Sequence, residues 1–434
     1  MLPAVRMRAP LVFVLIAAAV LRIVAVGDRL SADEGYTWLV ASSHGLGQFL
    51  DRLADYENTP PLYYLLVWPL PHDGEVWLRL PAVLAAVGCV AALWWTVRAL
   101  AGERAALLAA GALAVAPYAV SYSDFARGFM LADLGLIVAV GAAVRRRWWI
   151  YAIGVAVAVY CEYASVLFVV ALVVALAWSG LAPAREAVIR GLAPLLVLAV
   201  WIPEIVRGAD RIDKTKVSPV YPGPSPGTLR DLVVRLSFGE HGTAHSPGLR
   251  WLQFALVAAV LLWAFARAPR VLWMTAAGTL ALHAVVHWIG RDVFAPRYLT
   301  QLVPLGAAAL GYAVARMPQR SATAVAAAAI AAVGVAVVVQ RARREYEPDV
   351  PAVVKAVAAL APGRVVVTNS AVVAYYARGL HARLDRPFGL GPGIDPRRKS
   401  LLVIDDTRVA GGLRSGPGIT HSFGAIYVRV GRGK

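Results

Sequence analysis

Long apolar runs, separated by short polar breaks, dominate the chain. About eleven such runs cover residues 10–27, 77–100, 105–120, 129–144, 148–160, 164–178, 192–206, 251–265, 271–289, 299–315 and 321–339. A helix that crosses a bilayer needs about 20 apolar residues, and several of these runs are shorter than that. The pattern predicts an all-α polytopic membrane protein with about eleven transmembrane helices.

The composition agrees with a bilayer environment. Of the 434 residues, 59% are hydrophobic and 16% are charged, and the mean hydropathy is +0.63. A soluble domain could not keep such a surface in water. The net charge is +17, but the basic residues fall between the apolar runs and form no single basic face. We therefore expect membrane lipids as partners and no nucleic acid.

The positions of the arginines predict the topology. If the amino terminus is cytoplasmic, every turn after an even-numbered helix lies inside and is basic. These turns contain Arg98, Arg104, Arg145, Arg146, Arg147, Arg185, Arg190, Arg267, Arg270, Arg316 and Arg320. On the same count, the apolar segment 60–71 does not cross and lies in the outer interface or re-enters. The stretch 148–179 crosses twice, with its turn near Glu162 outside.

Three polar segments then lie outside: a first loop over residues 28–75, a second loop over 207–250, and a tail from 341 onward. The second loop is rich in Pro and Gly, which favours an irregular segment. In the tail, residues 350–360 have the pattern of an amphipathic helix, and residues 364–368 and 401–404 resemble buried strands. We expect a catalytic transmembrane domain over 1–340 and a small extracytoplasmic α/β domain over 341–434.

Candidate chemistry is concentrated in the first outer loop. Two adjacent acids at a membrane surface are usually only solvated charges, so Asp33 and Glu34 alone indicate little. Two further motifs follow them in the chain, and the order and spacing of all three together are specific. The motifs are Ser31-Ala32-Asp33-Glu34, Glu57-Asn58-Thr59-Pro60-Pro61-Leu62-Tyr63-Tyr64 and Leu78-Arg79-Leu80-Pro81.

This arrangement resembles the first outer loop of the GT-C glycosyltransferases related to protein O-mannosyltransferases and to the lipid A aminoarabinose transferase. Thr59 stands where many relatives have histidine. The resemblance continues through Ser123-Asp124-Phe125-Ala126-Arg127 and Phe294-Ala295-Pro296-Arg297-Tyr298-Leu299. It covers most of residues 10–340.

The resemblance implies transfer of a sugar from a polyprenyl-phosphate donor to an extracytoplasmic acceptor hydroxyl, with mannose as the first candidate sugar. The acceptor can be a glycan, a glycolipid or a protein. The predicted topology agrees, because it collects the candidate residues outside, where cytoplasmic nucleotide sugars are not expected. Arginine carries nearly all the positive charge and Ala and Val are abundant, which is typical of GC-rich bacterial genomes. We therefore expect the bacterial inner membrane.

The resemblance also suggests a role for each residue. Sugar transfer needs a base for the acceptor proton, which we assign to Asp33, with Glu34 positioning the base or the acceptor. One base implies inversion, although a nucleophilic role for Glu34 in a retaining reaction remains open. We expect Arg127 and Arg297 to bind the donor phosphate, because arginine pairs well with phosphate, and Asp124 to orient Arg127. The expected groove-lining residues are Tyr63, Tyr64, Glu57 and Tyr298.

Other polar residues fit structural roles better. Glu162 and Arg22 are of types that usually pack a bundle or anchor an interface. His283 and His287 are spaced four apart on a helix, but no third ligand is evident, so we expect no metal and no cofactor. Cys89 and Cys161 lie in separate apolar runs and predict no disulfide.

Two charged segments of the tail also have explanations that need no nucleotide sugar and no nucleic acid. Asp405-Asp406 follows a predicted strand and fits a turn better than a metal site for nucleotide sugars. Arg397-Arg398-Lys399 fits headgroups or the acceptor better than nucleic acid.

Two other functions remain open: a transporter or flippase of lipid-linked intermediates, and a structural subunit of an envelope assembly complex. A transporter would be expected to show two related halves with charges at the midplane. The sequence shows no such repeat.

Overall fold

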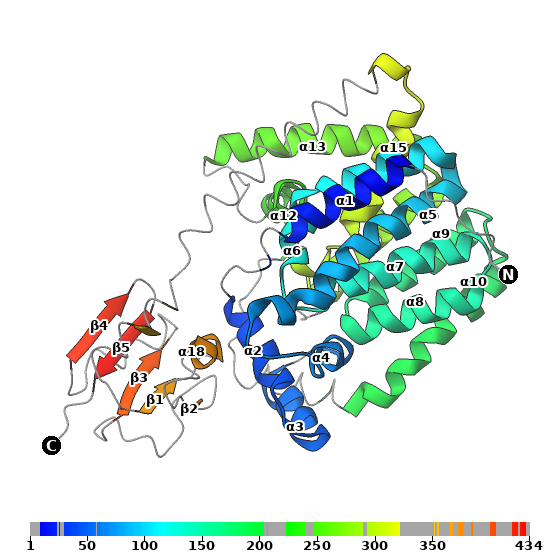
Figure 1. Ribbon diagram of the computed structural model, residues 1–434. Coiled ribbons are helices and arrows are strands. Elements are labelled where there is room, and N and C mark those ends of the chain that lie inside the picture. The colour runs from blue at the N-terminus through cyan, green and yellow to red at the C-terminus, as the bar shows by residue number, and fades with distance from the viewer. Residues whose placement is uncertain are drawn as a thin grey trace.

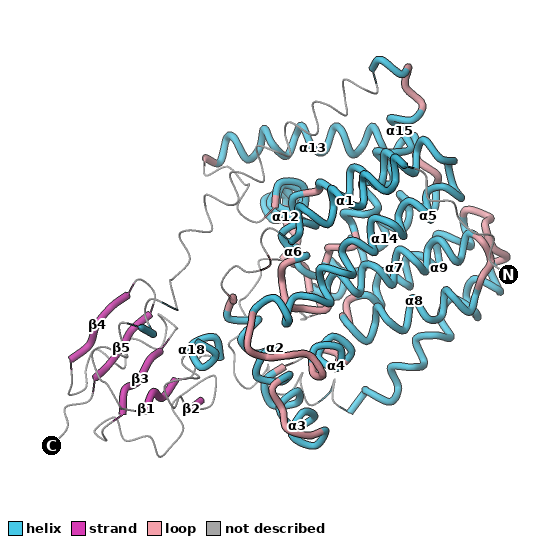
Figure 2. The backbone as a smooth tube through the Cα atoms, in the orientation of Figure 1, coloured by secondary structure: helices cyan, strands magenta, loops and turns pink. Residues whose placement is uncertain are grey.

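A computed structural model describes residues 9–23, 26, 30–57, 59–203, 206, 223–239, 246–289, 293–321, 351, 354–355, 365–368, 371–376, 383–384, 400–404, 419–423 and 426–430 (Figures 1 and 2). The first helices are α1 (Ala9–Ile23), α2 (Ala32–Ala41), α3 (Leu46–Tyr56), α4 (Leu62–Val67), α5 (Glu75–Val115), α6 (Pro117–Ser123), α7 (Phe129–Val144), α8 (Trp148–Cys161), α9 (Ser165–Trp178) and α10 (Ala184–Leu192). They are followed by the 3-10 helix η1 (Ala193–Trp201), α12 (Pro226–Phe238), α13 (Pro247–Arg267), α14 (Arg270–Trp288), the 3-10 turn η2 (Pro296–Tyr298) and α15 (Leu302–Ala315).

The helices pack into a bundle around α5, which contacts α1, α7 and α15. One hydrophobic cluster runs through these helices and through α8 and α9, and many of its buried members are alanines. Small side chains let helix axes approach closely, which is how helices associate when lipid surrounds them. Helix α5 combines two of the predicted spans. It bends at Gly102, whose φ of 81° lies in the left-handed region that favours glycine.

Several helices have the dimensions expected in a membrane. By length and composition, α5, α13 and α14 can each cross a bilayer, and α1, α7, α8, α9 and α15 are shorter apolar helices. Helices α8 and α9 form the hairpin predicted for residues 148–179, with Glu162 in the turn between them. Helix α4 lies in the segment that was predicted not to cross, and it is only six residues long. The last predicted span, 321–339, lies outside the described residues except for its first residue.

The two ends of the bundle differ. Helices α2, α3 and α4 lie at one end, and α10 lies at the other (Figure 1). Two arginines of the predicted inner turns make hydrogen bonds near the α10 end: Arg145 donates to the Trp95 carbonyl, and Arg104 donates to that of Met317. Hence the candidate residues of the first outer loop and these arginines lie at opposite ends.

The irregular structure predicted for the second outer loop is wrong for residues 226–238, which form α12. Ser225 starts this helix because its hydroxyl accepts from the Thr228 N–H, while the Thr228 hydroxyl accepts from the Ser225 N–H. Pro226 suits the first turn, where no intrahelical donor is needed. Leu232 and Val234 of this helix are buried. The abundant Pro and Gly residues of the loop concealed this signal.

In the tail, β1 (Val365–Thr368), β2 (Arg383–Leu384), β3 (Ser400–Ile404), β4 (Ile419–Phe423) and β5 (Ile426–Val430) form a sheet in the order β2-β1-β3-β5-β4. β1 pairs in parallel with β2 and β3, and the pairs of β5 with β3 and β4 are antiparallel. β1 and β3 occupy the two stretches that were predicted as strands. The short helix α18 (Ala371–Tyr376) lies between this sheet and the bundle and packs on α2 (Figure 1). The helix predicted at 350–360 lies mostly outside the described residues.

Candidate active site

The candidate site is built on the amino-terminal end of α2. Ser31 caps the helix, because its hydroxyl accepts from the Glu34 N–H while the Glu34 carboxylate accepts from the Ser31 N–H. This reciprocal pair fixes the first turn of the helix. Asp33 and Glu34 are adjacent residues of that turn, so their side chains leave the helix in different directions.

Glu34 points into the protein and is almost completely buried. Its Oε1 and Oε2 accept from Nε and Nη2 of Arg79 at 2.7 and 2.9 Å. Arg79 belongs to α5, is buried as well, and also donates to the carbonyl of Val26 just before α2. A paired, two-point contact of this kind is among the stronger ion pairs that side chains make. Through Glu34 and Val26, Arg79 attaches the first turn of α2 and the segment before it to α5.

Helix α2 also holds the loop between α6 and α7. The N–H of Ala126 donates to Glu34 Oε1 at 2.9 Å, and its carbonyl accepts from the Thr37 hydroxyl at 2.8 Å. Gly128, two residues later, passes so close to α8 that a Cβ would lie 2.7 Å from the Cys161 carbonyl oxygen. Arg127 is therefore presented to the site by a loop that is fixed on both sides.

Arg127 is buried and its contacts are well defined. Its Nη1 donates to Glu57 Oε2 and to the Tyr64 hydroxyl, both at 2.5 Å, and its Nη2 donates to the Asp33 carbonyl at 2.7 Å. The Tyr64 hydroxyl also bonds the Thr59 hydroxyl at 2.7 Å. Burial raises the pKa of Glu57, although the Arg127 guanidinium opposes this. Thr59, the residue that departs from the family pattern, thus contacts Tyr64, one of the residues that hold Arg127.

The Asp33 carboxylate faces two cations and remains accessible. Its Oδ1 lies 3.9 Å from Nη2 of Arg127, and its Oδ2 lies 3.7 Å from Nη1 of Arg297. The exposed fraction of the side chain is 48% for Asp33, 28% for Arg297 and 9% for Arg127. The Arg297 guanidinium lies over the Tyr298 ring, 5.0 Å from its centroid. Two segments far apart in the chain therefore meet at Asp33.

A pocket opens beside this group and reaches Glu57, which pairs with Arg127. It encloses about 480 Å³ of empty space, including its open mouth. It is lined by Leu50, Leu53, Ala54, Glu57, Thr59, Tyr163 and Trp201. The wall is mostly apolar, with two aromatic rings and one carboxylate, and such walls suit a sugar ring or the start of a lipid chain.

The structure shows the surroundings of three further predicted residues. Tyr63 is buried and donates to the Leu78 carbonyl, so it connects α4 to α5, and its groove-lining role stays a prediction. Tyr64 is equally buried, but its hydroxyl reaches Arg127. Asp124 is buried at the end of α6, and the carboxylates of Glu57 and Asp33 both form ion pairs with Arg127. An orienting role for Asp124 stays a prediction.

Glu162 lies closer to this group than its sequence context indicated. It is buried in the turn between α8 and α9, and its Oε1 accepts from the Ala164 N–H at 3.3 Å. Burial raises its pKa to about 7, while the Ala164 N–H and the Arg297 and Arg127 guanidiniums pull the pKa down. The signal available in the sequence was an acid in the middle of an unbroken apolar stretch, where a charge is expensive.

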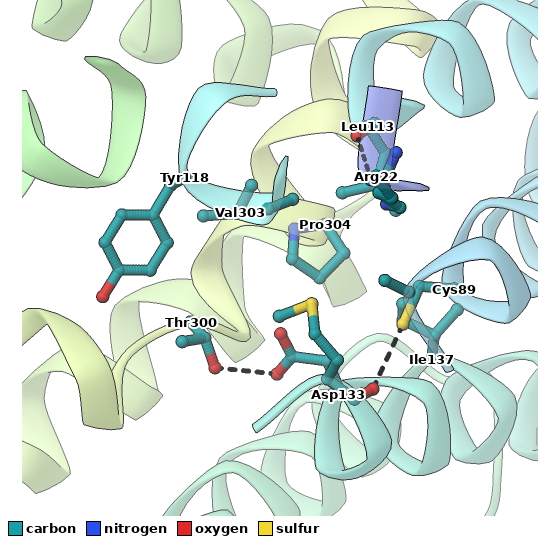
Figure 3. A pocket seen from close by; sticks show the side chains of 12 residues that line it. Arg22, Cys89, Leu113, Tyr118, Asp133, Ile137, Thr300, Val303 and Pro304 are labelled. Carbon is teal, nitrogen blue, oxygen red and sulfur yellow. Dashed lines mark hydrogen bonds between the residues drawn. The ribbon is translucent and has the colours of Figure 1, made fainter. Parts of the chain in front are cut away.

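A second polar group lies deeper in the bundle and is separate from Asp33. Asp133 of α7 accepts from the Thr300 hydroxyl at 2.9 Å (Figure 3). Across the same small pocket, Arg22 of α1 donates to the carbonyls of Ala18, Ala114 and Leu113. Arg22 therefore joins α1 to the end of α5, which agrees with its predicted packing role.

Metal ligation has no support in the described part of the chain, which contains no group of three candidate ligands. His283 is buried, and its Nδ1 lies 2.8 Å from the Thr279 carbonyl of its own helix. Cys89 and Cys161 are free thiols and are buried. The acids at 405–406 and the basic residues at 397–399 lie outside the described residues.

Comparisons with known proteins agree with this picture. Residues 59–206 match the sequence model of the dolichyl-phosphate-mannose-protein mannosyltransferase family. No curated protein matches the chain. Among solved structures, ArnT from Cupriavidus metallidurans bound to undecaprenyl phosphate is similar, with a TM-score of 0.64 and 15% identity over 96% of this chain and 97% of that one. The apo state of the same protein gives 0.66 and 16% over the same shares.

The archaeal oligosaccharyltransferase AglB from Archaeoglobus fulgidus, in complex with an inhibitory peptide and a dolichol-phosphate, is more distant. It gives a TM-score of 0.50 and 12% identity over 92% of this chain and 69% of that one. At these identities the matches show a shared fold. The predicted all-α membrane fold and the resemblance to the GT-C glycosyltransferases are thereby confirmed.

Proposed function

We propose that this chain, an integral membrane protein related to the GT-C glycosyltransferases, transfers a sugar from a polyprenyl-phosphate donor to an acceptor hydroxyl. The observation that carries the proposal is the accessible Asp33 carboxylate between the guanidiniums of Arg127 and Arg297. Polyprenyl phosphates named with two proteins of this fold, undecaprenyl phosphate with ArnT and dolichol-phosphate with AglB, support a lipid phosphate as the carrier.

The reaction needs a base for the acceptor proton and positive charge beside the leaving phosphate. The acceptor oxygen attacks the anomeric carbon, and its proton passes to the Asp33 carboxylate. The bond between that carbon and the phosphate oxygen breaks, and the electron pair leaves with the phosphate. The leaving polyprenyl phosphate gains negative charge, so a fixed guanidinium beside it stabilises the transition state more than the ground state.

The two arginines differ in how they can serve this step. Glu57 neutralises Arg127, whose Nη atoms are already bound to Glu57, Tyr64 and the Asp33 carbonyl. Arg297 is more exposed and lies 3.7 Å from Asp33 Oδ2. Arg297 is therefore the main phosphate ligand in our proposal, and Arg127 mainly holds Glu57, Tyr64 and α2 in register.

We propose inversion at the anomeric carbon. A retaining reaction needs a second carboxylate that can reach the sugar as a nucleophile. Glu34 is a poor candidate because both of its oxygens accept hydrogen bonds from Arg79 and from backbone N–H groups, and it is buried. Its role in this proposal is to position α2 and the Ala126 loop.

We place the site on the extracytoplasmic face of the bacterial inner membrane. The basic turns predict that the end of the bundle with α10 is cytoplasmic. The site then faces the other side, where sugars arrive attached to lipids. The pocket beside Glu57, with Tyr163 and Trp201 in its wall, is the proposed place for the sugar. Mannose is the first donor sugar to test, because the matching family model describes mannosyltransferases.

The experiment is a transfer assay on purified protein in lipid nanodiscs, with a panel of polyprenyl-phosphate sugars. Release of polyprenyl phosphate is measured in the presence of candidate glycan, glycolipid and peptide acceptors. Asp33→Asn should lower release by about 100-fold or more, as expected for loss of a general base. Asp51→Asn is the matched control, since Asp51 is an exposed carboxylate on α3 in the same segment. Full release by Asp33→Asn would contradict the assigned base.

A further inference from the structure

The carboxy-terminal domain contacts the helix that carries Asp33. Helix α18 packs on α2, and Tyr375 of α18 places its ring against Trp38 in an edge-to-face contact with centroids 5.5 Å apart. Tyr375 and Val372 are buried. Helix α2 is therefore held on one side by the Ala126 loop, through Thr37, and on another by the tail, through Trp38.

A second contact lies directly at the start of α2. The N–H of Leu30 donates to the Tyr376 hydroxyl at 2.8 Å, across 346 positions of sequence. The same hydroxyl faces the carboxylate of Glu75, the first residue of α5. Burial and the Glu75 carboxylate raise the pKa of Tyr376 to about 12, so the phenol keeps its proton and can donate it to Glu75.

Tyr376 thus connects the same two segments as Arg79. Arg79 lies one turn after Glu75 on α5 and binds Val26 and Glu34. Tyr376 binds Leu30, which lies between Val26 and Glu34, and it faces Glu75. Two side chains from different parts of the chain therefore fix the short segment that leads into α2. Asp33 is only three residues beyond Leu30.

We propose that the carboxy-terminal domain is a working part of the active site, in which Tyr376, supported by Tyr375, positions Asp33. This inference rests on the proposed sugar transfer. Tyr376 touches no reacting atom and is a positioning residue. The Asp33 oxygens lie 3.7 to 3.9 Å from the two guanidiniums, so a small shift of the first turn of α2 changes the geometry at which the base works. Misplacement by about 1 Å can cost on the order of 100-fold in rate.

The test compares Tyr376→Phe with Tyr151→Phe in the full-length protein. Tyr151 is the control because its hydroxyl also bonds a backbone group away from α2: it donates to the Gly191 carbonyl, whereas the Tyr376 hydroxyl accepts from the Leu30 N–H. With undecaprenyl-phosphate mannose as the donor, Tyr376→Phe should lower kcat about tenfold and change the donor KM less than about twofold. Tyr151→Phe should keep the kcat of the wild type. A residue that only stabilised the fold would lower the thermal midpoint and leave kcat per folded molecule unchanged.

Hydrogen exchange gives a readout that needs no activity. The amides of residues 30–37 should exchange faster in Tyr376→Phe than in the wild type or in Tyr151→Phe. Unchanged exchange there would overturn the proposal whatever the activity, and so would faster exchange combined with an unchanged kcat. If the wild type transferred no sugar from any donor, the proposed function would fail, and the exchange comparison would still decide whether Tyr376 holds the start of α2.

Discussion

Asp33 and Glu34 are neighbours in the chain but have different surroundings. Successive residues on a helix point about 100° apart, so one of two adjacent acids can face a cavity while the other enters the core. Glu34 is buried against Arg79, and Asp33 keeps a half-exposed carboxylate. The sequence motif identifies the pair as a unit. Only the rotation of α2 about its axis assigns the two roles, and that rotation is set by contacts with α5 and the Ala126 loop.

Glu34→Gln should destabilise the protein strongly. The change leaves the buried Arg79 guanidinium without its carboxylate, and removal of one partner from a buried pair costs about 3–5 kcal/mol. Thermal unfolding in detergent measures the effect. Asp33→Asn is the control: its carboxylate is half exposed and its ion pairs are long, so it should shift the free energy of unfolding by less than about 1 kcal/mol. Equal stability of the two variants would contradict the structural role of Glu34.

Glu162 should make stability depend on pH. Burial raises its pKa in the folded protein to about 7, well above the ordinary value for a glutamate of about 4.3. Between these values the folded state binds one more proton than the unfolded state. The free energy of unfolding therefore falls as the pH rises from about 4.5 to about 7, by on the order of 3 kcal/mol.

The neutral variant Glu162→Gln should lack this dependence. Its thermal midpoint, relative to that of the wild type, should rise between about pH 5 and about pH 8, because only the wild type must hold a buried charge at the higher pH. The Arg297 and Arg127 guanidiniums face Glu162 and are already reflected in the pKa of about 7. A difference between the two midpoints that stays constant with pH would show that Glu162 does not titrate in this range.

At the scale of elements, α7 and α8 meet at a pair of glycines. A Cβ on Gly135 would lie 2.5 Å from the Gly154 carbonyl oxygen, and a Cβ on Gly154 would lie 2.6 Å from that of Gly135. The backbones touch here because neither residue has a side chain. Such close approach allows dispersion contacts to hold helices together inside lipid.

Gly154→Ala should therefore separate α7 from α8 and destabilise the protein by about 1–3 kcal/mol, the usual cost of overpacking. Gly111→Ala is the control. Gly111 also lies inside a helix, but a Cβ there would meet no atom within 4 Å, so alanine should stabilise the helix by up to about 1 kcal/mol. Opposite shifts of the two thermal midpoints are expected, and a similar shift for both would argue against the close crossing.

Helices were predictable where periodicity and length were informative. The apolar runs correspond to α7, α8, α9, α13 and α14, and basic residues at both ends of 148–179 predicted the hairpin. Helix α12 was missed because its amino-terminal signal, Ser225-Pro226, lies in a segment rich in turn residues. The two runs around Gly102 correspond to two helical segments of α5 that meet at a kink, because a single glycine with positive φ redirects the chain without a loop.

At the scale of the whole molecule, contacts between distant segments were the least predictable. The sequence indicated that the tail folds separately, and nothing local shows that Tyr376 meets Leu30. The meeting of Arg297 with Asp33 was predictable only through the family resemblance, which placed both in one reaction. The partners of buried side chains were not predictable either: Tyr63 and Tyr64 are adjacent and equally buried, yet Tyr64 bonds Arg127 and Tyr63 bonds the Leu78 carbonyl.

The orientation predicted for the whole bundle from its charges can be tested by cysteine labelling. Both native cysteines are buried, so a single introduced cysteine should dominate the reaction with a membrane-impermeant maleimide. Asp51 is exposed on α3 at the end that carries Asp33. The Asp51→Cys variant should therefore react in intact cells from which the outer membrane has been removed. Arg147 is exposed in the basic turn between α7 and α8. The Arg147→Cys variant should therefore react only after the membrane is opened. The unsubstituted protein controls for reaction of Cys89 and Cys161. The reverse pattern would place Asp33 on the cytoplasmic side, where nucleotide sugars are available, and would remove the reason for requiring a donor carried by a lipid.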